Sequence, residues 1–268
     1  MAAAARQLDG HMIDLHCHVL PGVDDGPASL GDALALARDA RADGITTIAA
    51  TPHVDAQHRH VDAALVRAAV PALQRSLDAA EIDVHVVPGA EVAATRAIEL
   101  GDAELRALTL GGGPWLLLEC PLETGRVPWF MGVARMLARR GHRLLLAHPE
   151  RSPLFLRAPE LLDELVDEGM LAQVTAGALA GRYGRTVRDV ALRLLERETV
   201  HVVASDGHGR QRPARIGAEL ALAGIEPALA HWLACAAPAA LLTGEPLPPR
   251  PPVAPPARRR RALRLVGR

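Results

Sequence analysis

Short apolar runs alternate with amphipathic segments along most of the chain. Runs rich in Leu, Val, Ile and Ala predict strands buried on both faces, at residues 12–16, 45–50, 84–88, 115–119, 143–147, 171–175 and 200–204. Segments with the apolar spacing of helices separate these runs, near residues 30–43, 61–80, 128–140, 159–169, 187–197, 213–223 and 227–236. The alternation predicts a single-domain α/β fold whose seven strands close into a barrel-like arrangement.

Local signals mark two of the predicted helices. Ser29 is expected to cap the helix at 30–43, and Gly44 is expected to end it. Pro71 lies inside the helical pattern at 61–80. Because proline lacks the N–H that a helix interior requires, we expect Pro71 to kink this helix or divide it in two.

Residues that can bind metal ions follow directly after most of the predicted strands. A lone buried histidine is usually a packed core residue, but packing does not explain repeated His, Asp and Glu at strand ends. An unpaired carboxylate buried there would carry a large desolvation penalty, which a cation would offset. In α/β barrels the active site also lies at the C-terminal ends of the strands. The candidate ligands are His16, His18, Asp25, His53, Glu91, Glu119, His148, Asp206 and His208.

Two pairs in this set have the same spacing. His16 and His18 are two residues apart, as are Asp206 and His208, so each pair projects from one face of an extended chain. Taken alone, the histidine pair is more often a half-exposed strand face, and Asp24-Asp25-Gly26 is more often a turn. Mixed imidazole and carboxylate ligands suit Mn²⁺, Fe or Zn²⁺. Because the set is large for two ions, we expect three divalent metal ions.

The composition fits an ordinary globular enzyme, with 49% hydrophobic and 23% charged residues. Three cysteines cannot form a disulfide framework, and no apolar run is long enough for a signal peptide or a membrane span. We therefore expect a cytoplasmic protein. The body shows no excess of basic residues, so no nucleic-acid partner is expected.

The C-terminal segment differs from the rest. We expect a folded body at 1–243 and a Pro- and Arg-rich, extended tail at 244–268. Residues 250–268 hold seven arginines and no acidic residue. The simpler interpretation of this charge is a solvated end. The functional one is weak contact with an acidic partner or an anionic membrane surface.

The motifs together resemble those of the polymerase-and-histidinol-phosphatase (PHP) superfamily. Within it, the chain is similar to the bacterial protein-tyrosine phosphatases of capsule and exopolysaccharide clusters. The resemblance covers residues 12 to about 240 and rests on IDLHCHVLPGVDDG, ITTIAATPH, PGAEV, LLLEC, LLLAHPER and VHVVASDGHGR, which occur in the family's order. One departure is Cys17, where relatives often have Ser, and strand alternation predicts that it points away from the ligands.

The resemblance implies a distorted (β/α)7 PHP-type barrel with a trinuclear centre that is often manganese. It implies one ion on His16, His18, Glu91 and Asp206, a second on Glu91, Glu119 and His148, and a third on Asp25, His53 and His208. Arg151 and Arg212 match arginines that hold the substrate phosphate. Asp24 matches a residue outside the ligand set.

The implied activity is phosphomonoester hydrolysis by a metal-activated hydroxide. By resemblance, the substrate is a phosphotyrosine protein, such as the C-terminal tail of a bacterial tyrosine kinase of polysaccharide biosynthesis. Three alternatives remain open. One is a small-molecule phosphatase of the histidinol-phosphate kind, another is a PHP nuclease, and the third is a non-catalytic metal-bound regulator.

A further alternative comes from Cys120 and Arg126, which have the C-x5-R spacing of cysteine-dependent tyrosine phosphatases. In such a loop, backbone amides cradle the phosphate and the thiolate attacks it. Here Pro121 removes one amide donor, and Glu123 would repel phosphate. We interpret the spacing as chance.

Overall fold

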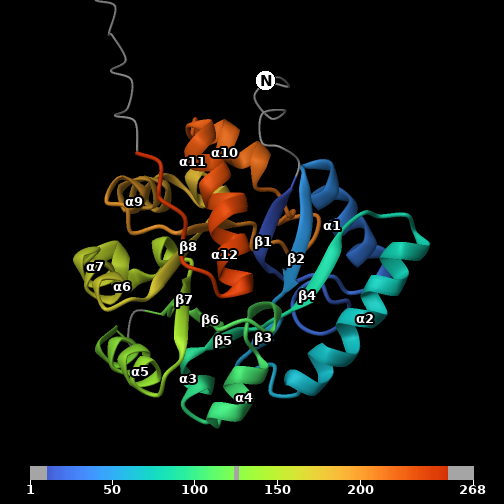
Figure 1. Cartoon of the computed structure of the whole chain (residues 1–268), viewed down its shortest axis with the longest axis horizontal. Coiled ribbons are helices and arrows are strands. Elements are labelled where there is room, and N and C mark those ends of the chain that lie inside the picture. The colour runs from blue at the N-terminus through green and yellow to red at the C-terminus, as the bar shows by residue number, and fades with distance from the viewer. Residues whose placement is uncertain (1–10, 124–126, 253–268) are drawn as a thin grey trace, which may run out of the picture.

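Parallel strands in two sheets form the centre of this mixed α/β, single-domain fold (Figure 1). The computed structural model describes residues 11–123 and 127–252. The first sheet has the order β1-β2-β4 and contains β1 (Met12–Cys17), β2 (Ile45–Ala50) and β4 (His85–Pro88). The second has the order β3-β5-β6-β7-β8-β9 and contains β3 (His53–Val54), β5 (Glu91–Ala93), β6 (Trp115–Glu119), β7 (Arg143–Ala147), β8 (Leu171–Thr175) and β9 (Val202–Ala204). Every pair of neighbours runs parallel.

Helices surround the strands on the outside of the molecule (Figure 1). The longer ones are α1 (Leu30–Ala42), α2 (Ala63–Ala79), α5 (Val127–Arg139), α7 (Glu160–Asp167), α9 (Arg185–Glu196) and α10 (Gly217–Ala223). Shorter ones are α3 (Ala94–Ala97), α4 (Asp102–Ala107), α6 (Pro153–Arg157) and α8 (Ala176–Leu179). The last helical stretch runs from α11 (Pro227–His231) through a π-helical turn (Trp232–Ala236) into α12 (Ala237–Thr243).

The predicted strands all occur, and two short strands were not predicted. β2 leaves the first sheet at Thr51-Pro52 and continues as β3 in the second. β4 does the same through Gly89-Ala90 and continues as β5. Because β3 pairs with β5, His53 lies directly opposite Glu91. The two crossings therefore carry candidate ligands from one sheet to the other.

Of the two outcomes expected for Pro71, a kink or a division, the division does not occur, because α2 is one helix from Ala63 to Ala79. Pro71 lies on the solvent side, while Val66, Val70 and Leu73 are buried on the other. Packing of that apolar face offsets the hydrogen bond that proline removes. The predicted cap of α1 is confirmed, since the Ser29 side chain accepts a hydrogen bond from the backbone N–H of Asp32.

The start of the Pro- and Arg-rich segment contacts the body. The Trp232 indole donates to the Pro248 carbonyl at 3.0 Å, and the Arg250 guanidinium lies 5.0 Å from the centroid of the same ring. Leu247 packs against both hydrophobic clusters. Residues 253–268, which contain most of the arginines, lie outside the described residues, and the boundary after residue 243 stays a prediction.

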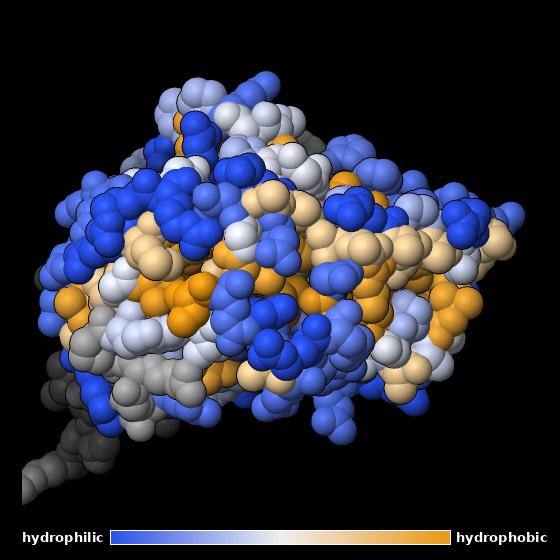
Figure 2. Space-filling view, turned by 90° about the horizontal axis from the view of Figure 1, so that it is seen from below, coloured by the Kyte–Doolittle hydropathy of each residue, from blue (hydrophilic) through white to orange (hydrophobic). Residues whose placement is uncertain are grey.

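On the face in Figure 2, hydrophobic side chains lie in a band across the middle, and hydrophilic side chains border and interrupt this band. The large exposed hydrophobic residues are Leu30, Ile98, Leu122, Trp129 and Leu222. Within residues 11–123 and 127–252, no helix has both the length and the apolar character needed to span a membrane.

Candidate metal centre and arginine rim

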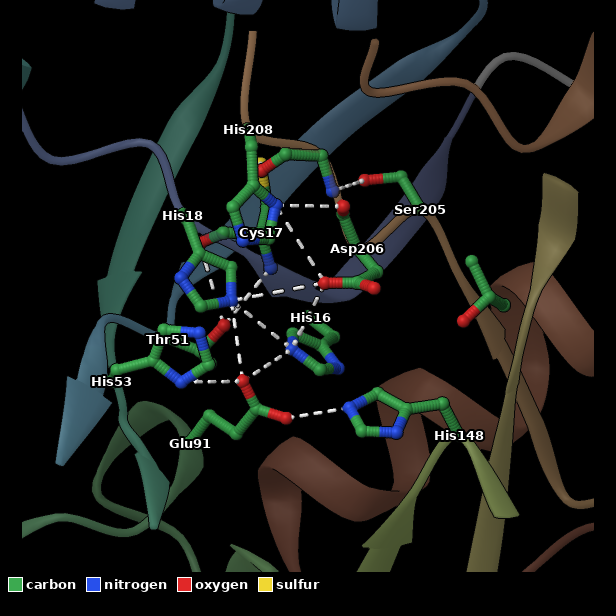
Figure 3. A network of polar contacts seen from close by, with 12 residues as sticks. His16, Cys17, His18, Thr51, His53, Glu91, His148, Ser205, Asp206 and His208 are labelled. Atoms are coloured by element: carbon green, nitrogen blue, oxygen red, sulfur yellow. Dashed lines mark hydrogen bonds and ion pairs between the residues drawn. The ribbon is translucent and has the colours of Figure 1, made fainter. Parts of the chain in front are cut away.

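All nine candidate ligands lie in one region at the C-terminal ends of the strands, and Figure 3 shows seven of them, namely His16, His18, His53, Glu91, His148, Asp206 and His208. β1 supplies His16 and leads to His18, while His53 and Glu91 begin β3 and β5. The others end or follow a strand or lie in the loop after β1, namely Asp25, Glu119, His148, Asp206 and His208. Seven of the nine contribute nitrogen and oxygen atoms to three overlapping groups, which do not include His148 and Asp206. The groups are His18, Asp25, His53 and His208; His16, His18 and Glu91; and His53, Glu91 and Glu119, each with ligand atoms within 4.8 Å of one another.

The Glu91 carboxylate lies at the centre of the cluster and is 1% exposed. Its Oε2 atom is 3.2 Å from His16 Nε2, 3.3 Å from His18 Nε2 and 3.1 Å from His53 Nδ1. Its Oε1 atom is 2.7 Å from His148 Nε2. One carboxylate therefore joins four imidazoles that are far apart in the sequence (Figure 3).

Two further carboxylates enclose the same imidazoles. Asp25 Oδ1 is 3.3 Å from His208 Nε2 and 3.5 Å from His53 Nε2. Asp206 Oδ1 is 3.5 Å from His16 Nε2. The rings of His18 and His208 stack with their centroids 3.8 Å apart. The cluster therefore continues without interruption from the strand ends to the loop that holds Asp25.

Buried partners fix the orientation of the two histidines of β1 and its extension. His16 Nδ1 donates to Gln173 Oε1 at 2.9 Å, and His18 Nδ1 donates to an Asp24 oxygen at 2.6 Å. With a proton on each Nδ1, each Nε2 is an acceptor that faces the centre. Asp24 also accepts from the His53 backbone N–H at 2.9 Å. The resemblance already placed Asp24 outside the ligand set. The sequence pattern gave no indication that Gln173 contacts a candidate ligand.

The electrostatics of the cluster favour positive charge at its centre. The Nε2 atoms of His16 and His18 face each other at 3.3 Å, an arrangement that a proton or a metal cation shared between them stabilises. Burial, together with repulsion from Glu91, raises the pKa of Glu119 to about 9. Burial alone would lower the pKa of His18, but hydrogen bonds with Asp24 and Glu91 raise it to about 10. Both the ligand atoms and the electrostatic preference for positive charge at the centre fit divalent cations.

Backbone geometry also shapes the cluster. His148 and Asp206 have φ angles of 38° and 52°, in the left-handed region that residues other than glycine rarely adopt. Such conformations persist where the surroundings determine them and are common at functional sites. A Cβ atom on Gly26 would lie 2.4 Å from the His18 carbonyl oxygen. The glycine of the Asp24-Asp25-Gly26 turn thus allows the turn to approach His18.

Asp14, which the sequence analysis did not single out, connects the two ends of the cluster. It is fully buried and accepts from the Ser205 backbone N–H at 3.0 Å and from the Ser205 hydroxyl at 2.5 Å. The backbone N–H of Asp206 in turn donates to the His16 carbonyl at 2.8 Å. These contacts attach the segment after β9 to the end of β1. An acidic residue inside an apolar run gave the only sequence signal for this role.

Two arginines form a rim beside the cluster, which we call the arginine rim. Arg151 and Arg212 both pair with Asp206 Oδ2, the oxygen that does not face the histidines. The Arg151 guanidinium also lies 4.8 Å from the centroid of the Tyr183 ring. Burial alone would raise the pKa of Asp206, but His16, His148 and the two arginines hold it well below its usual range. Both predicted phosphate ligands thus lie next to the candidate metal ligands.

Neither cysteine discussed in the sequence analysis has the environment of a nucleophile. Cys120 is fully buried, and its burial raises the pKa of the thiol well above the usual value. A reactive cysteine requires the thiolate. Arg126, its proposed partner, lies outside the described residues. Cys17 is also buried, and its Sγ is 3.5 Å from the Gly207 carbonyl oxygen.

The sequence of the chain matches a described protein family and individual curated proteins. Residues 12–230 match the family described as "Capsular polysaccharide synthesis, CpsB/CapC". Over 198 residues, the chain is 37% identical to the tyrosine-protein phosphatase YwqE of Bacillus subtilis (strain 168), a match covering 74% of this chain and 77% of that protein. It is 30% identical over 198 residues to the putative tyrosine-protein phosphatase CapC of Staphylococcus aureus, with the same two coverages of 74% and 77%.

Solved structures show a similar fold. One, from a study of YwqE from Bacillus subtilis and CpsB from Streptococcus pneumoniae as unique metal-dependent tyrosine phosphatases, matches with a TM-score of 0.77 and 31% identity. The match covers 92% of this chain and 100% of that chain. A β-aspartyl dipeptidase from Fervidobacterium islandicum AW-1 matches with a TM-score of 0.54 at 16% identity, which is a likeness of fold alone.

Proposed function

The chain belongs to the CpsB/CapC family of capsular polysaccharide synthesis, and we propose that it is a metal-dependent protein-tyrosine phosphatase. One observation carries this proposal, which is the carboxylate of Glu91 among four imidazoles, with two arginines on the neighbouring Asp206. A centre that binds cations, beside two partly exposed guanidinium groups, suits a phosphate ester, whose transferred group carries negative charge throughout the reaction.

We assign the nine clustered residues as ligands of three divalent ions. Nitrogen and oxygen donors together support Mn²⁺, with Fe and Zn²⁺ compatible with the same donors. The resemblance supports the division into three sets given in the sequence analysis, and the close grouping of seven of the nine residues is compatible with more than one ion. The proposed ligands are His16, His18, Asp25, His53, Glu91, Glu119, His148, Asp206 and His208.

The chain's own residues bind and orient the substrate. When bound, divalent ions polarise phosphoryl oxygens and lower the pKa of water, so that a nucleophile exists at neutral pH. Arg151 and Arg212 carry donors that match two oxygens of a phosphoryl group. The Tyr183 ring contacts the Arg151 guanidinium and helps to hold its orientation. A phenolate is a good leaving group, so the reaction needs no strong general acid and no covalent enzyme intermediate.

We also infer that the two sheets form one distorted (β/α)7 barrel. If β2 with β3 and β4 with β5 each count as one bent strand, the order around the molecule follows the chain from β1 to β9. The parallel bridge between Cys17 and Gly207 brings the end of that order back to β1. Side chains from six strands share one hydrophobic cluster, as the interior of a barrel requires, among them Leu15, Ala49, Leu117, Leu145, Leu171 and Val202.

The finer identity of the substrate rests on the family. We propose that the phosphoprotein is the C-terminal tail of a bacterial tyrosine kinase of polysaccharide biosynthesis; the family's description supports the link to polysaccharide synthesis, and the kinase tail rests on the resemblance. The basic residues at 258–268 would add weak contact with an anionic membrane surface. Sedimentation of the full chain and of a chain ending at residue 252 with anionic and neutral vesicles tests that contact. Equal sedimentation of the two chains contradicts it.

The proposed activity is tested by comparing a phosphotyrosine peptide with histidinol phosphate and single-stranded DNA as substrates. Each is measured with added Mn²⁺ and after treatment with chelator. We expect turnover of the phosphopeptide that chelator abolishes and Mn²⁺ restores. A preference for histidinol phosphate or DNA would favour the small-molecule phosphatase or the nuclease. A fully metal-loaded protein with no turnover of any substrate would favour a regulator.

The buried thiol provides a separate control. A Cys120→Ser variant should keep its phosphopeptide turnover and its chelator sensitivity, because Cys120 is fully buried and its pKa is raised. Loss of turnover in a folded, metal-loaded Cys120→Ser protein would instead support the cysteine-dependent mechanism.

A further inference from the structure

A cavity of about 160 Å³ opens beside the arginine rim, and most of the residues that line it have no role in the proposed reaction. We call it the basic pocket. It is lined by Arg212 of the rim and by Tyr183, the ring that Arg151 contacts, and none of the nine candidate metal ligands lines it. Among the residues that line it are Arg182, Tyr183, Gln211, Arg212, Arg215 and Glu219.

The lining residues of the basic pocket carry more positive than negative charge, although Arg182 pairs with Glu219 and Arg212 pairs with Asp206. Three arginines line it, and Glu219 is the one carboxylate among its lining residues in the described part of the chain. Glu219 is 2% exposed, and its Oε1 atom accepts from Arg182 Nε at 2.6 Å. Arg182 keeps 54% of its side chain exposed. The buried carboxylate thus orients this guanidinium without removing it from solvent.

The backbone that carries Arg215 is also held in place. The backbone N–H groups of Ile216 and Gly217 donate to Asp43 Oδ2 at 2.6 Å and 2.7 Å. Arg215 itself is exposed and lines the basic pocket. Two accessible guanidinium groups, on Arg182 and Arg215, therefore lie on supported backbone next to the position proposed for the substrate phosphate.

From this arrangement we propose that the basic pocket binds a second anionic group of the substrate, next to the phosphotyrosine in the sequence. The inference rests on the proposed function and adds a preference among phosphotyrosine segments. The anionic group is either a carboxylate or a second phosphate, since paired guanidinium groups bind both. The opposite side of the centre has another character, because the cavity beside Glu119 is lined by Asp55, Leu122 and Trp129.

The test uses phosphotyrosine peptides that differ only in the neighbouring residue, which is Gln, Glu, phosphotyrosine or Arg. In the Mn²⁺-loaded full chain, kcat/KM for the Glu peptide should exceed that for the Gln peptide about threefold to fivefold, as for a partly exposed ion pair. The peptide with a second phosphate, which carries more charge, should gain about tenfold. The Arg peptide should be the poorest substrate. Equal values for all four peptides would overturn the proposal.

The variant Arg215→Gln removes one charge from the basic pocket and leaves the arginine rim intact. We expect both preferences to fall below about twofold, with unchanged turnover of free phosphotyrosine. Arg210→Gln is the matched control, because Arg210 belongs to the same loop but lines a different cavity. An equal loss of preference in both variants would indicate net charge alone and overturn the proposal.

Failure of the proposed function gives a different result. If the Mn²⁺-loaded chain hydrolyses none of the four phosphotyrosine peptides, the proposed activity is wrong, and binding of the same peptides with a fluorescent label then tests the basic pocket. Tighter binding of the Glu and doubly phosphorylated peptides, lost in Arg215→Gln, supports the pocket. Equal binding of all peptides overturns it.

Discussion

The histidine cluster and the arginine rim meet at Asp206, yet they are built differently. In the cluster, His16 and His18 are fully buried, and each has a second buried partner behind the ring. In the rim, the side chains of Arg151 and Arg212 are 18% and 33% exposed and share a single carboxylate oxygen. The cluster is therefore fixed before any ligand arrives, whereas the rim can exchange a carboxylate for another anion.

This difference assigns the two regions separate tasks. A rigid set of buried donors favours metal ions, because their geometry must be correct without rearrangement. Partly exposed guanidinium groups on a carboxylate can turn toward a substrate phosphate with little loss of structure. If the division is correct, substitutions in the cluster should remove metal and activity together, and substitutions in the rim should remove activity alone.

The largest effect is expected for Glu91→Ala. This change removes the oxygen atoms that four imidazoles contact, and the residue assigned to two ions. Metal content should fall strongly, and kcat/KM should fall by about three orders of magnitude or more, as expected when metal-assisted chemistry is lost. Elemental analysis and phosphopeptide kinetics measure the two quantities. Glu99→Ala, at an exposed carboxylate, is the control. Near-normal metal content and turnover would contradict the assignment.

Asp206→Asn should affect both regions at once. It keeps the shape of the side chain but removes the charge that Oδ1 presents to His16 and Oδ2 presents to the arginines. We expect partial loss of metal and a fall in kcat/KM of about 100-fold, the upper range for a change of this kind near a metal. The same two measurements apply. A variant that lost activity with full metal content would show that Asp206 belongs to the rim alone.

Arg151→Ala and Arg212→Ala should each reduce phosphate binding while leaving metal content unchanged. A charge-assisted hydrogen bond is worth about 1.5–3 kcal/mol, which corresponds to a fall in kcat/KM of about 10- to 150-fold. Inhibition by inorganic phosphate should weaken in parallel. Arg210→Ala, in the same loop as Arg212, should change neither value. Loss of metal from either rim variant would remove the distinction between the two regions.

The smallest effect is expected for Gln173→Ala, which acts from behind His16. Loss of the acceptor for Nδ1 should weaken metal binding about 10-fold without removing a ligand. Competition with a chelator measures the affinity, and kcat at saturating Mn²⁺ should stay near normal. Gln74→Ala is the matched control, since Gln74 also has buried partners but lies on α2. If Gln173→Ala and the unmodified protein lost metal to the chelator equally, metal binding by His16 would not depend on Gln173.

Sequence alone predicted the strands and the residues that follow them, because buried parallel strands are continuous apolar runs that end at a polar residue. It did not predict β3 and β5, since strands of two and three residues carry no detectable period. It also left open that Pro71 divides α2, because the exposed position of the ring depends on packing that only the folded chain provides.

The supporting residues were harder to find than the candidate ligands. Gln173 acts on His16 across 157 positions of sequence, and Asp14 acts on Ser205 across 191. Neither residue type is unusual in its own segment. Their roles appear only when the strands are placed side by side, as does the basic pocket, to which Arg182 and Arg215 come from separate loops.

The bridge between Cys17 and Gly207 has a consequence for biosynthesis. Translation releases the first histidines early, but the residues that complete their surroundings are among the last of the body to leave the ribosome. A nascent chain therefore cannot assemble the centre while it is still short. Metal binding at the complete site would then be a late event. A prematurely terminated product would contain His16 and His18 without the later residues that complete their surroundings.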